Sequence, residues 1–169
     1  EAVTRALGEF RCAFTRRRGE AVELARAAAR GGERLVVAVG GDGTASEVID
    51  GLVDGGRLIE PEMVFGCIPR GTGSDLRRTL GWPDDPVEAA RTVAAGEVRQ
   101  CDLGLVEYQG HDGRTGTRHF ANVASFGVSG LVVAKVNRGG KLQTKDGKTL
   151  SEEEGKELVR EFVAARQKE

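Results

Sequence analysis

Two glycine-rich segments contain the residues best suited to do chemistry. The first, Gly40-Gly41-Asp42-Gly43-Thr44, follows the apolar run Leu35–Val39, and the second, Pro-Arg-Gly-Thr-Gly-Ser-Asp at 69–75, follows the apolar run Met63–Ile68. Because glycine has no Cβ, its backbone N–H can approach an anion closely, and a following helix adds unpaired N–H groups and a positive dipole end. Two such loops at strand ends predict one nucleotide held between neighbouring βα turns.

These loops need parallel strands to bring them together, and the flanking sequence predicts such strands. We expect strands at Glu9–Phe14, Arg34–Val39 and Met63–Ile68, the second covered on both faces because its apolar run is nearly continuous. Helical stripes lie between the strands: Val22, Ala25 and Ala29 in the helix Gly19–Arg30, closed by Gly31 and Gly32, and then Ala45, Val48, Ile49, Leu52 and Val53. The order β-α-β-α favours crossover connections between parallel strands.

The middle of the chain continues the pattern. Asp85 is expected to cap a helix that has Pro86 at its first position, has Glu88 reaching back, and ends at Gly96. Two further strands, Val98–Val106 and Arg118–Ser125, flank the polar loop Gln109–Gly116 and are most simply an antiparallel pair, followed by a short helix at Val128–Val136. The sequence therefore predicts an α/β fold, a three-layer sandwich with a mainly parallel central sheet and right-handed crossovers.

Composition narrows the classes of function. The 169 residues suit one α/β domain, and 25 basic against 26 acidic residues lack the positive footprint of a nucleic-acid binder. Cys12, Cys67 and Cys101 are odd in number and lie in apolar segments, which predicts reduced core thiols and a cytoplasmic setting. No apolar run approaches eighteen residues, so membrane contact is expected to be peripheral.

The last residues differ in character from the rest. A tight turn is expected at Lys145–Lys148, and Ser151 with Glu154 forms a capping box for an amphipathic helix extending to Arg166. We therefore divide the chain into residues 1–141 and an atypical tail, 142–169. An apolar face left open on the first part would favour self-association into a homo-oligomer, unless the terminal helix covers it.

The ordered motifs resemble those of the diacylglycerol kinase and sphingosine kinase catalytic domain, particularly of the soluble bacterial lipid kinases. That family has GGDGT followed by Glu, then Pro and GTGND, then an Asp-containing strand and an aromatic-x-Asn strand. The matching residues are Gly40–Thr44 with Glu47, Pro69 with Gly71–Asp75, Asp102, and Phe120-Ala121-Asn122 with Gly127. The resemblance covers about Phe10 to Lys141 and implies the Rossmann-like fold of the NAD kinase and diacylglycerol kinase type. NAD kinases and phosphofructokinases share a GGDGT-like loop but lack the second loop in this form.

Three features depart from the family pattern. Ser74 stands where the family usually has Asn, which loses the paired donor and acceptor of an amide. The chain begins after the place of the family's first strand and its Asn-Pro loop, so nucleotide affinity is expected to be reduced. Nothing after Lys141 resembles the family's second, all-β domain, which bears the general base and metal-binding residues. No catalytic residue is therefore assigned within this chain.

The resemblance implies that ATP, with Mg²⁺, is bound by residues of the two loops and their surroundings. Backbone amides of Gly41 and Gly43 are expected to surround the phosphates, while Thr44 donates a hydroxyl. The full set of candidate nucleotide-binding residues is Thr15, Gly40, Gly41, Asp42, Gly43, Thr44, Glu47, Gly71, Thr72, Gly73 and Asp75. No protein metal ligands are assigned.

Several of these residues have plainer interpretations that the sequence leaves open. Asp42 either holds the loop or a metal-bound water, or caps the helix that begins near Gly43. Thr15 and Thr72 either contact nucleotide or satisfy their own turns, and Glu47 either faces the site or is solvated. Asp75 either braces the loops, faces the acceptor hydroxyl, or caps a helix at 76–80.

Other polar residues are more ambiguous. The side chains of Arg70, Arg77 and Arg78 either meet phosphates and anionic headgroups or lie on a solvated surface. Asp102 and Asn122 are expected to join a polar network that ties the returning strands to the nucleotide domain. His111 and His119 are too few for a metal centre, and Trp82 is expected to pack in the core.

Three functions follow from the resemblance and remain open at this point. The leading one is an ATP-dependent lipid kinase domain that transfers the γ-phosphoryl group to a hydroxyl of diacylglycerol or a related lipid, in phospholipid metabolism at the inner face of the membrane. The second is an ATP-binding or regulatory module without turnover, because the base-bearing domain is not seen. The third is an NAD kinase-like phosphotransferase.

Overall fold

The computed structural model describes residues 7–71, 75–110 and 112–124. The chain divides into two units, Glu1–Val123 and Ala124–Glu169, and the account below concerns the first. The expected helices at 128–136 and 151–166, the turn at 145–148 and residues Thr72, Gly73, Ser74, His111 and Gly127 lie outside the described residues. The division at Lys141 therefore stays a prediction.

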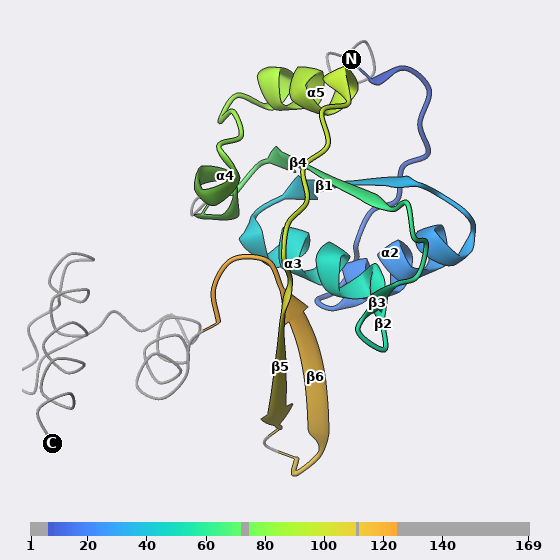
Figure 1. The fold of residues 1–169 in the computed structure, drawn as a ribbon, viewed down its shortest axis with the longest axis vertical. Coiled ribbons are helices and arrows are strands. Elements are labelled where there is room, and N and C mark those ends of the chain that lie inside the picture. The colour runs from blue at the N-terminus through green and yellow to red at the C-terminus, as the bar shows by residue number, and fades with distance from the viewer. Residues whose placement is uncertain (1–6, 72–74, 111, 125–169) are drawn as a thin grey trace, which may run out of the picture. The chain divides into compact units, whose positions relative to one another are not determined.

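A parallel pair of strands lies at the centre of this unit (Figure 1). β1 spans Leu35–Gly40 and β4 spans Val64–Pro69, and they pair in parallel from Leu35 opposite Val64 to Gly40 opposite Pro69. Between them in sequence lies the helix α3, Asp42–Gly51, so that β1, α3 and β4 form a crossover unit. The two expected central strands and their parallel relation are confirmed.

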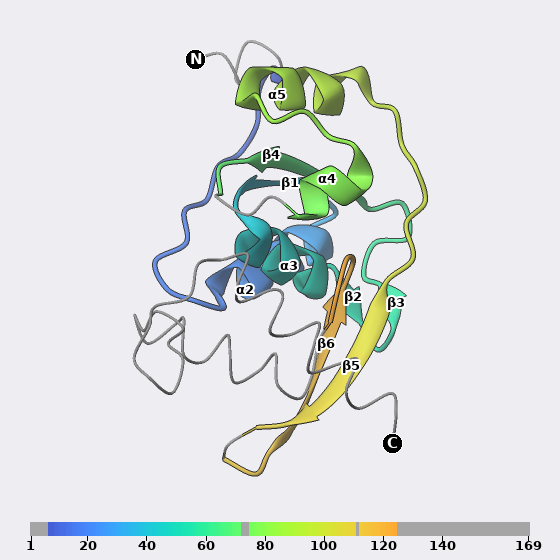
Figure 2. The ribbon, with the colours of Figure 1, turned by 90° about the vertical axis from the view of Figure 1, so that its left-hand side faces the viewer.

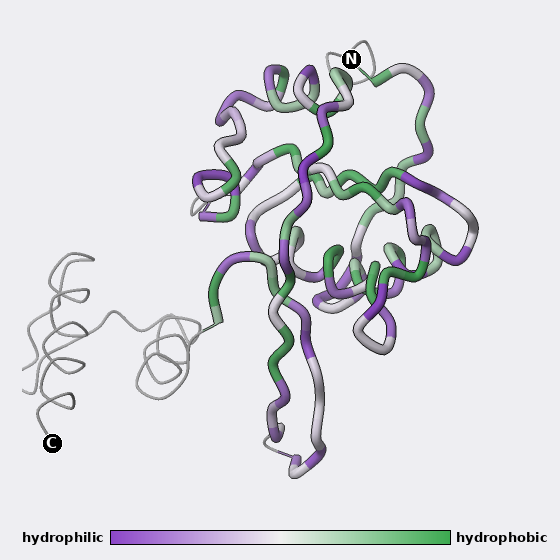
Figure 3. The backbone as a smooth tube through the Cα atoms, viewed as in Figure 1, coloured by the Kyte–Doolittle hydropathy of each residue, from purple (hydrophilic) through white to green (hydrophobic). Residues whose placement is uncertain are grey.

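Helices cover both faces of this pair. The helix α2, Glu20–Arg30, packs with α3 against one face, and the helix α5, Pro86–Ala95, contacts β4 on the other. Side chains alternate accordingly, because successive residues of a strand point to opposite faces: Ala38 and Cys67 join the α2 and α3 core, whereas Val37 and Ile68 join α5. Figure 3 shows the apolar residues gathered along β1 and β4 between the helices.

The prediction of a strand at Glu9–Phe14 is wrong. These residues have no regular structure, and the side chains of Phe10 and Phe14 are 49% and 83% exposed. An extended segment becomes a strand only when a neighbour satisfies its backbone N–H and C=O groups, and the pairing described for β1 is with β4.

The expectation that β1 is covered on both faces holds for only part of the strand. Leu35 is 46% and Val39 is 58% exposed. Both lie on the same face as Val37, where α5 packs over β4 rather than over β1. A nearly continuous apolar run therefore identified the strand but not the extent of its cover.

The expected cap of α5 is confirmed. Asp85 accepts hydrogen bonds from the backbone N–H groups of Val87 and Glu88 at 2.9 and 3.0 Å, Pro86 is the first helical residue, and Gly96 ends the helix with a φ of 71°. The Glu88 carboxylate does not reach back as expected but bonds Arg91 at 2.5 Å. Within a helix, Arg91 is three residues away on the same surface, so this partner competes with the cap.

Two antiparallel hairpins complete the described unit (Figure 2). β2, Val53–Asp54, pairs with β3, Arg57–Leu58, across Gly55 and Gly56, whose φ angles of 56° and 76° suit a two-residue turn. This hairpin was missed, although the Asp-Gly-Gly sequence indicates it. β5, Gly104–Gln109, pairs with β6, Thr115–Phe120, as the expected antiparallel pair with shifted limits.

The cysteines differ from expectation. Cys67 is buried in the core, but Cys12 and Cys101 are exposed, so the interpretation of all three as core thiols is wrong. Cys12 lies in the unpaired 9–14 segment and Cys101 lies just before β5. In the described part of the chain, no helix is both long and apolar enough to cross a membrane.

Candidate nucleotide-binding site

The two glycine loops lie side by side at one end of the parallel strands. Gly40, the last residue of β1, is opposite Pro69, the last residue of β4, because the strands are parallel and in register. Just beyond them, the backbone N–H of Arg70 donates to the carbonyl oxygen of Gly40 at 2.8 Å. The proximity expected for the two loops is therefore present in the fold.

The loops touch through glycine backbones. A Cβ placed on Gly71 would lie 2.5 Å from the Cα of Gly41, and one placed on Gly41 would lie 3.3 Å from the Cα of Gly71. The first distance is shorter than carbon atoms tolerate without movement of the backbone. Glycine at 71 is thus required by the close approach of the loops, whatever the loops bind.

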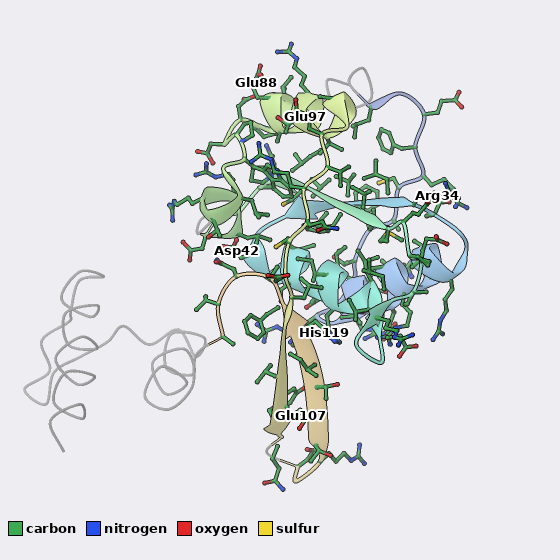
Figure 4. The ribbon with its side chains drawn as sticks, viewed as in Figure 1. Arg34, Asp42, Glu88, Glu97, Glu107 and His119 are labelled. Carbon is green, nitrogen blue, oxygen red and sulfur yellow. The ribbon has the colours of Figure 1, made fainter. Side chains whose placement is uncertain are left out.

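Asp42 joins the first loop to the helix after the second. Its two carboxylate oxygens accept hydrogen bonds from the backbone N–H groups of Asp75 and Leu76, each at 3.1 Å. These residues begin α4, Asp75–Leu80, so Asp42 satisfies donors that the helix itself leaves unpaired. Figure 4 shows Asp42 at the start of α3, facing α4. Of the alternatives for Asp42, capping occurs, but the capped helix is α4 rather than its own.

The start of α3 presents an open backbone surface. The helix begins at Asp42, and its first described backbone bond is from the N–H of Ala45 to the carbonyl of Gly41, at 3.1 Å. Apart from its chain neighbours and its own helix backbone, a Cβ added to Gly43 would meet no described atom within 4 Å, whereas one added to Gly40 would lie 2.8 Å from the Thr44 hydroxyl oxygen. Gly43 therefore faces space, and Thr44 packs against the end of β1.

Cys67, two residues before the end of β4, lies in the apolar core on the α3 face of the sheet. Burial, and to a smaller extent the negative charge of Asp42, raise the pKa of the Cys67 thiol to about 11. Ala38, its partner across the parallel pair, is also buried. This part of the sheet is thus apolar, and the Cys67 thiol is uncharged at neutral pH.

Glu47 and Thr15 lie away from the contact between the loops. The Glu47 carboxylate accepts the backbone N–H of Gly19 at 3.0 Å, so it ties α3 to the residue that caps α2. Thr15 is exposed in the segment before α2 and is not at the end of a strand, as was expected. Their roles in nucleotide binding stay predictions.

The three arginines around the second loop have different surroundings. The Arg77 guanidinium donates to the carbonyl of Trp82 at 3.1 Å and lies 3.2 Å from the carboxylate of Asp84. Arg77 is therefore engaged in contacts within the fold. Arg78 pairs with Asp75 at 2.8 Å on the surface, and Arg70 is exposed. Trp82 packs beside Phe65 with ring centroids 6.0 Å apart, as expected for a core residue.

Residues near the end of β6 contact the helices that follow both loops. His119 donates its backbone N–H and its ring Nδ1–H to one oxygen of Asp50 in α3, at 2.8 and 3.1 Å. The Thr79 hydroxyl in α4 donates to the side-chain oxygen of Asn122 at 2.9 Å. The expected tie through Asn122 is confirmed.

Sequence reasoning missed the role of His119. Its partner Asp50 is 69 residues away in the chain, and no local pattern indicates such a pair. Asp102 has no comparable tie: it is exposed before β5, outside the strand in which it was expected. Among the described residues, no three His, Cys, Asp or Glu side chains are placed to hold a metal ion.

Comparison with known proteins gives the class. Residues 1–106 match the model of the diacylglycerol kinase catalytic domain, and the chain belongs to that family of lipid kinases. The resemblance drawn from the glycine loops is confirmed.

The individual relatives are bacterial. The chain is 35% identical over 114 residues to a Chromohalobacter salexigens protein named "Probable lipid kinase YegS-like", covering 68% of this chain and 33% of that protein. It is 37% identical over 110 residues to the diacylglycerol kinase of Bacillus subtilis, covering 64% of this chain and 32% of the relative. A crystal structure of a Bacillus anthracis diacylglycerol kinase has a TM-score of 0.54 and 26% identity, covering 70% and 39% of the two chains. The chain thus spans about a third of the length of these curated relatives.

Proposed function

We propose that this chain is the nucleotide-binding part of an ATP-dependent lipid kinase, which transfers the γ-phosphoryl group of ATP to a hydroxyl of diacylglycerol or a related lipid. The observation that carries the proposal is the contact between the two glycine loops at Gly41 and Gly71, at the shared end of two parallel strands. Ligands of open α/β sheets bind outside the carboxyl ends of the strands, and phosphates favour helix N-termini there. Family membership supports ATP as the phosphate donor.

The start of α3 fits nucleotide phosphates. Gly43 leaves open the space that a side chain would occupy, so backbone N–H groups can be approached from that side. The negative charge of Asp42 would oppose phosphate binding, but both of its oxygens accept backbone N–H groups from α4. These hydrogen bonds hold the carboxylate on the side of the second loop, at the N-terminus of α4.

The family's chemistry is mostly positioning and charge neutralisation, and Mg²⁺ supplies the latter by bridging phosphate oxygens. The described residues offer no built cluster of metal ligands, so we propose that Mg²⁺ arrives with ATP. Gly40, Gly41, Gly43 and Thr44 would contact the phosphates directly. Thr15, Glu47, Gly71, Thr72, Gly73 and Asp75 complete the proposed nucleotide site, and Asp42 holds its two loops together.

The proposal extends to the fold and its setting. We infer a Rossmann-like three-layer sandwich of the NAD kinase and diacylglycerol kinase type over residues 1–141, with 142–169 as a separate tail. The helices packed on the two faces of the β1–β4 pair support this assignment. Acting on a lipid, such a domain would work at the surface of the membrane, from the cytoplasmic side.

The second candidate function is nucleotide binding without turnover. It is favoured by one observation, that the chain spans about a third of the length of its curated relatives. No residue described in this chain is assigned as the general base. On this proposal the chain binds Mg-ATP but transfers no phosphoryl group by itself.

One experiment separates these functions. Calorimetric titration of the chain with Mg-ATP is followed by radiolabelled phosphate transfer to diacylglycerol in mixed micelles, with NAD as the alternative acceptor. Binding with transfer to the lipid establishes the kinase, and binding without transfer establishes the second function. Transfer to NAD would favour the NAD kinase-like activity, whereas absence of Mg-ATP binding would reject both proposals.

A further inference from the structure

The helices α3 and α4 are joined to each other at their N-terminal ends. There the Asp42 carboxylate, at the start of α3, accepts the first two backbone N–H groups of α4, those of Asp75 and Leu76. Both helices follow a glycine loop of the proposed nucleotide site.

The same two helices are tied near their C-terminal ends to the end of β6. Asp50, the penultimate residue of α3, accepts two hydrogen bonds from His119, and Thr79, the penultimate residue of α4, donates to Asn122. The side chains of Asp50 and His119 are 16% and 13% exposed, so their hydrogen bonds are largely protected from water. Figure 4 shows His119 where the hairpin meets α3.

Apolar packing supports these ties. Ala121 packs against the core that contains Ala45, Val48 and Leu76, and it lies between the two tying residues in sequence. The carbon atoms of the Phe120 ring lie 2.3 to 2.8 Å from the position of a Cβ on Gly104, which fixes the end of the hairpin from its other strand. The segment His119–Asn122 is thus held on several sides.

We propose that His119 and Asn122 are positioning residues for the nucleotide site. Asp42 joins the N-terminal ends of α3 and α4, and His119 and Asn122 are tied to their C-terminal ends, so the contacts form a closed ring. The spacing of the two helix N-termini therefore depends on the residues at the C-terminal end of β6. Among the described residues, the hydrogen bonds of His119 and Asn122 go to Asp50 and Thr79 and not to the glycine loops, so their effect passes through Asp50 and Thr79. The proposal rests on the proposed function for one of its two measurements, the Kd for Mg-ATP.

Substitutions that remove or keep one hydrogen-bonding partner test the ring in the full chain. Asn122→Ala and Thr79→Val each remove one partner of the α4 tie, and Asn122→Asp keeps an oxygen that accepts from Thr79. Thr92→Val is the matched control, because Thr92, an exposed residue of α5, also donates its hydroxyl, to the carbonyl of Glu88 at 3.0 Å. Asp50→Ala removes the α3 tie, and Asp50→Asn keeps one acceptor oxygen for His119.

Two readouts are taken from each variant: the Kd for Mg-ATP, and the amide hydrogen exchange of Asp75 and Leu76, whose N–H groups bond Asp42. We expect Asn122→Ala, Thr79→Val and Asp50→Ala to raise the Kd between about twofold and thirtyfold, the range of network mutations that contact no ligand. The two amides should exchange faster in the same variants. Asn122→Asp and Asp50→Asn should restore both readouts toward the wild-type values, and Thr92→Val should change neither.

Unchanged Kd and unchanged exchange in Asn122→Ala and Asp50→Ala would overturn the proposal. If the wild-type chain does not bind Mg-ATP, the proposed function fails, and exchange at Asp75 and Leu76 still decides whether the ring exists. If Asp50→Ala does not fold, the surface substitution Thr79→Val gives the decision. A variant can also lose overall stability while its Asp75 and Leu76 amides exchange no faster under conditions in which the chain stays folded. That result would show that the contacts are merely structural, and would also overturn the proposal.

Discussion

The backbones of Gly41 and Gly71 are in direct contact, since a Cβ on Gly71 would lie 2.5 Å from the Cα of Gly41. These residues are thirty positions apart and belong to loops that follow different strands. The hydrogen bond from Arg70 N–H to the Gly40 carbonyl holds the same approach from the adjacent residues. The two loops therefore form one surface. They can approach this closely because Gly41 and Gly71 have no side chains.

The first prediction concerns Gly71. Gly71→Ala should push the loops apart and lower the free energy of unfolding by about 1–3 kcal/mol, the usual cost of overpacking. Urea unfolding measures the stability, and calorimetry with Mg-ATP measures the site. Gly51→Ala is the control, because its Cβ would lie 2.4 Å from the Val22 carbonyl oxygen between α2 and α3, away from the loops. Both variants should be destabilised, and wild-type stability of Gly71→Ala would contradict the contact.

The second prediction concerns Gly43, where an added Cβ meets no described atom beyond its chain neighbours and its own helix backbone within 4 Å. Gly43→Ala should leave the fold intact and change its stability by no more than about 1 kcal/mol, because alanine suits a helix better than glycine. It should abolish detectable Mg-ATP binding in calorimetry, since the Cβ would occupy the space proposed for the phosphates. A variant that binds Mg-ATP with wild-type affinity would remove Gly43 from the proposed site.

The third prediction concerns Asp42. Asp42→Ala leaves the N–H groups of Asp75 and Leu76 without their acceptor, and we expect a loss of about 1 kcal/mol in unfolding free energy, as for other helix caps. The Kd for Mg-ATP should rise as well, because the two loops lose their link. Asp85→Ala removes the corresponding cap of α5 and serves as the control. It should cost similar stability and leave the Kd unchanged; equal effects of the two variants on Kd would argue against a linking role of Asp42.

The fourth prediction concerns the thiols. The pKa of Cys67 is raised from 9.0 to about 11, so the folded state holds its proton where the unfolded state loses it. The contribution of Cys67 to stability is complete below pH 9 and should be lost as the pH rises from about 9 to 11. Urea unfolding of wild-type and Cys67→Ala chains at several pH values measures this difference. A constant difference in unfolding free energy between the two chains across that range would contradict it.

Thiol labelling gives a fifth prediction. Cys12 and Cys101 are exposed, whereas Cys67 is buried with a raised pKa, which disfavours the reactive thiolate. In the native chain at neutral pH, an alkylating reagent should modify Cys12 and Cys101 much faster than Cys67. Mass spectrometry of the digested protein identifies the modified residues, and denaturation in urea before labelling should make all three react. Labelling of Cys67 at the rate of Cys12 in the native chain would show that its site is open.

Local chemistry allowed much of this molecule to be predicted from sequence. Asp85, Pro86 and Gly96 marked the limits of α5 because each satisfies or permits a backbone geometry near its own position. Gly40–Thr44 and Gly71 marked the two loops and, in their order, the family. Apolar runs located β1 and β4, since a strand that lies between helices needs apolar residues on both faces.

What the tertiary structure alone decided concerns partners distant in sequence. The segment 9–14 has the alternation of a strand, yet forms none, because pairing needs a neighbour that a local pattern does not supply. The sequence presented Asp42 as a cap for its own helix or a holder of its loop, but its oxygens bond the backbone of α4, 33 and 34 residues away. His119 likewise acquires its role only from Asp50. Spacing along the chain determines which face of an element a residue occupies, whereas the packing of elements determines which group it meets.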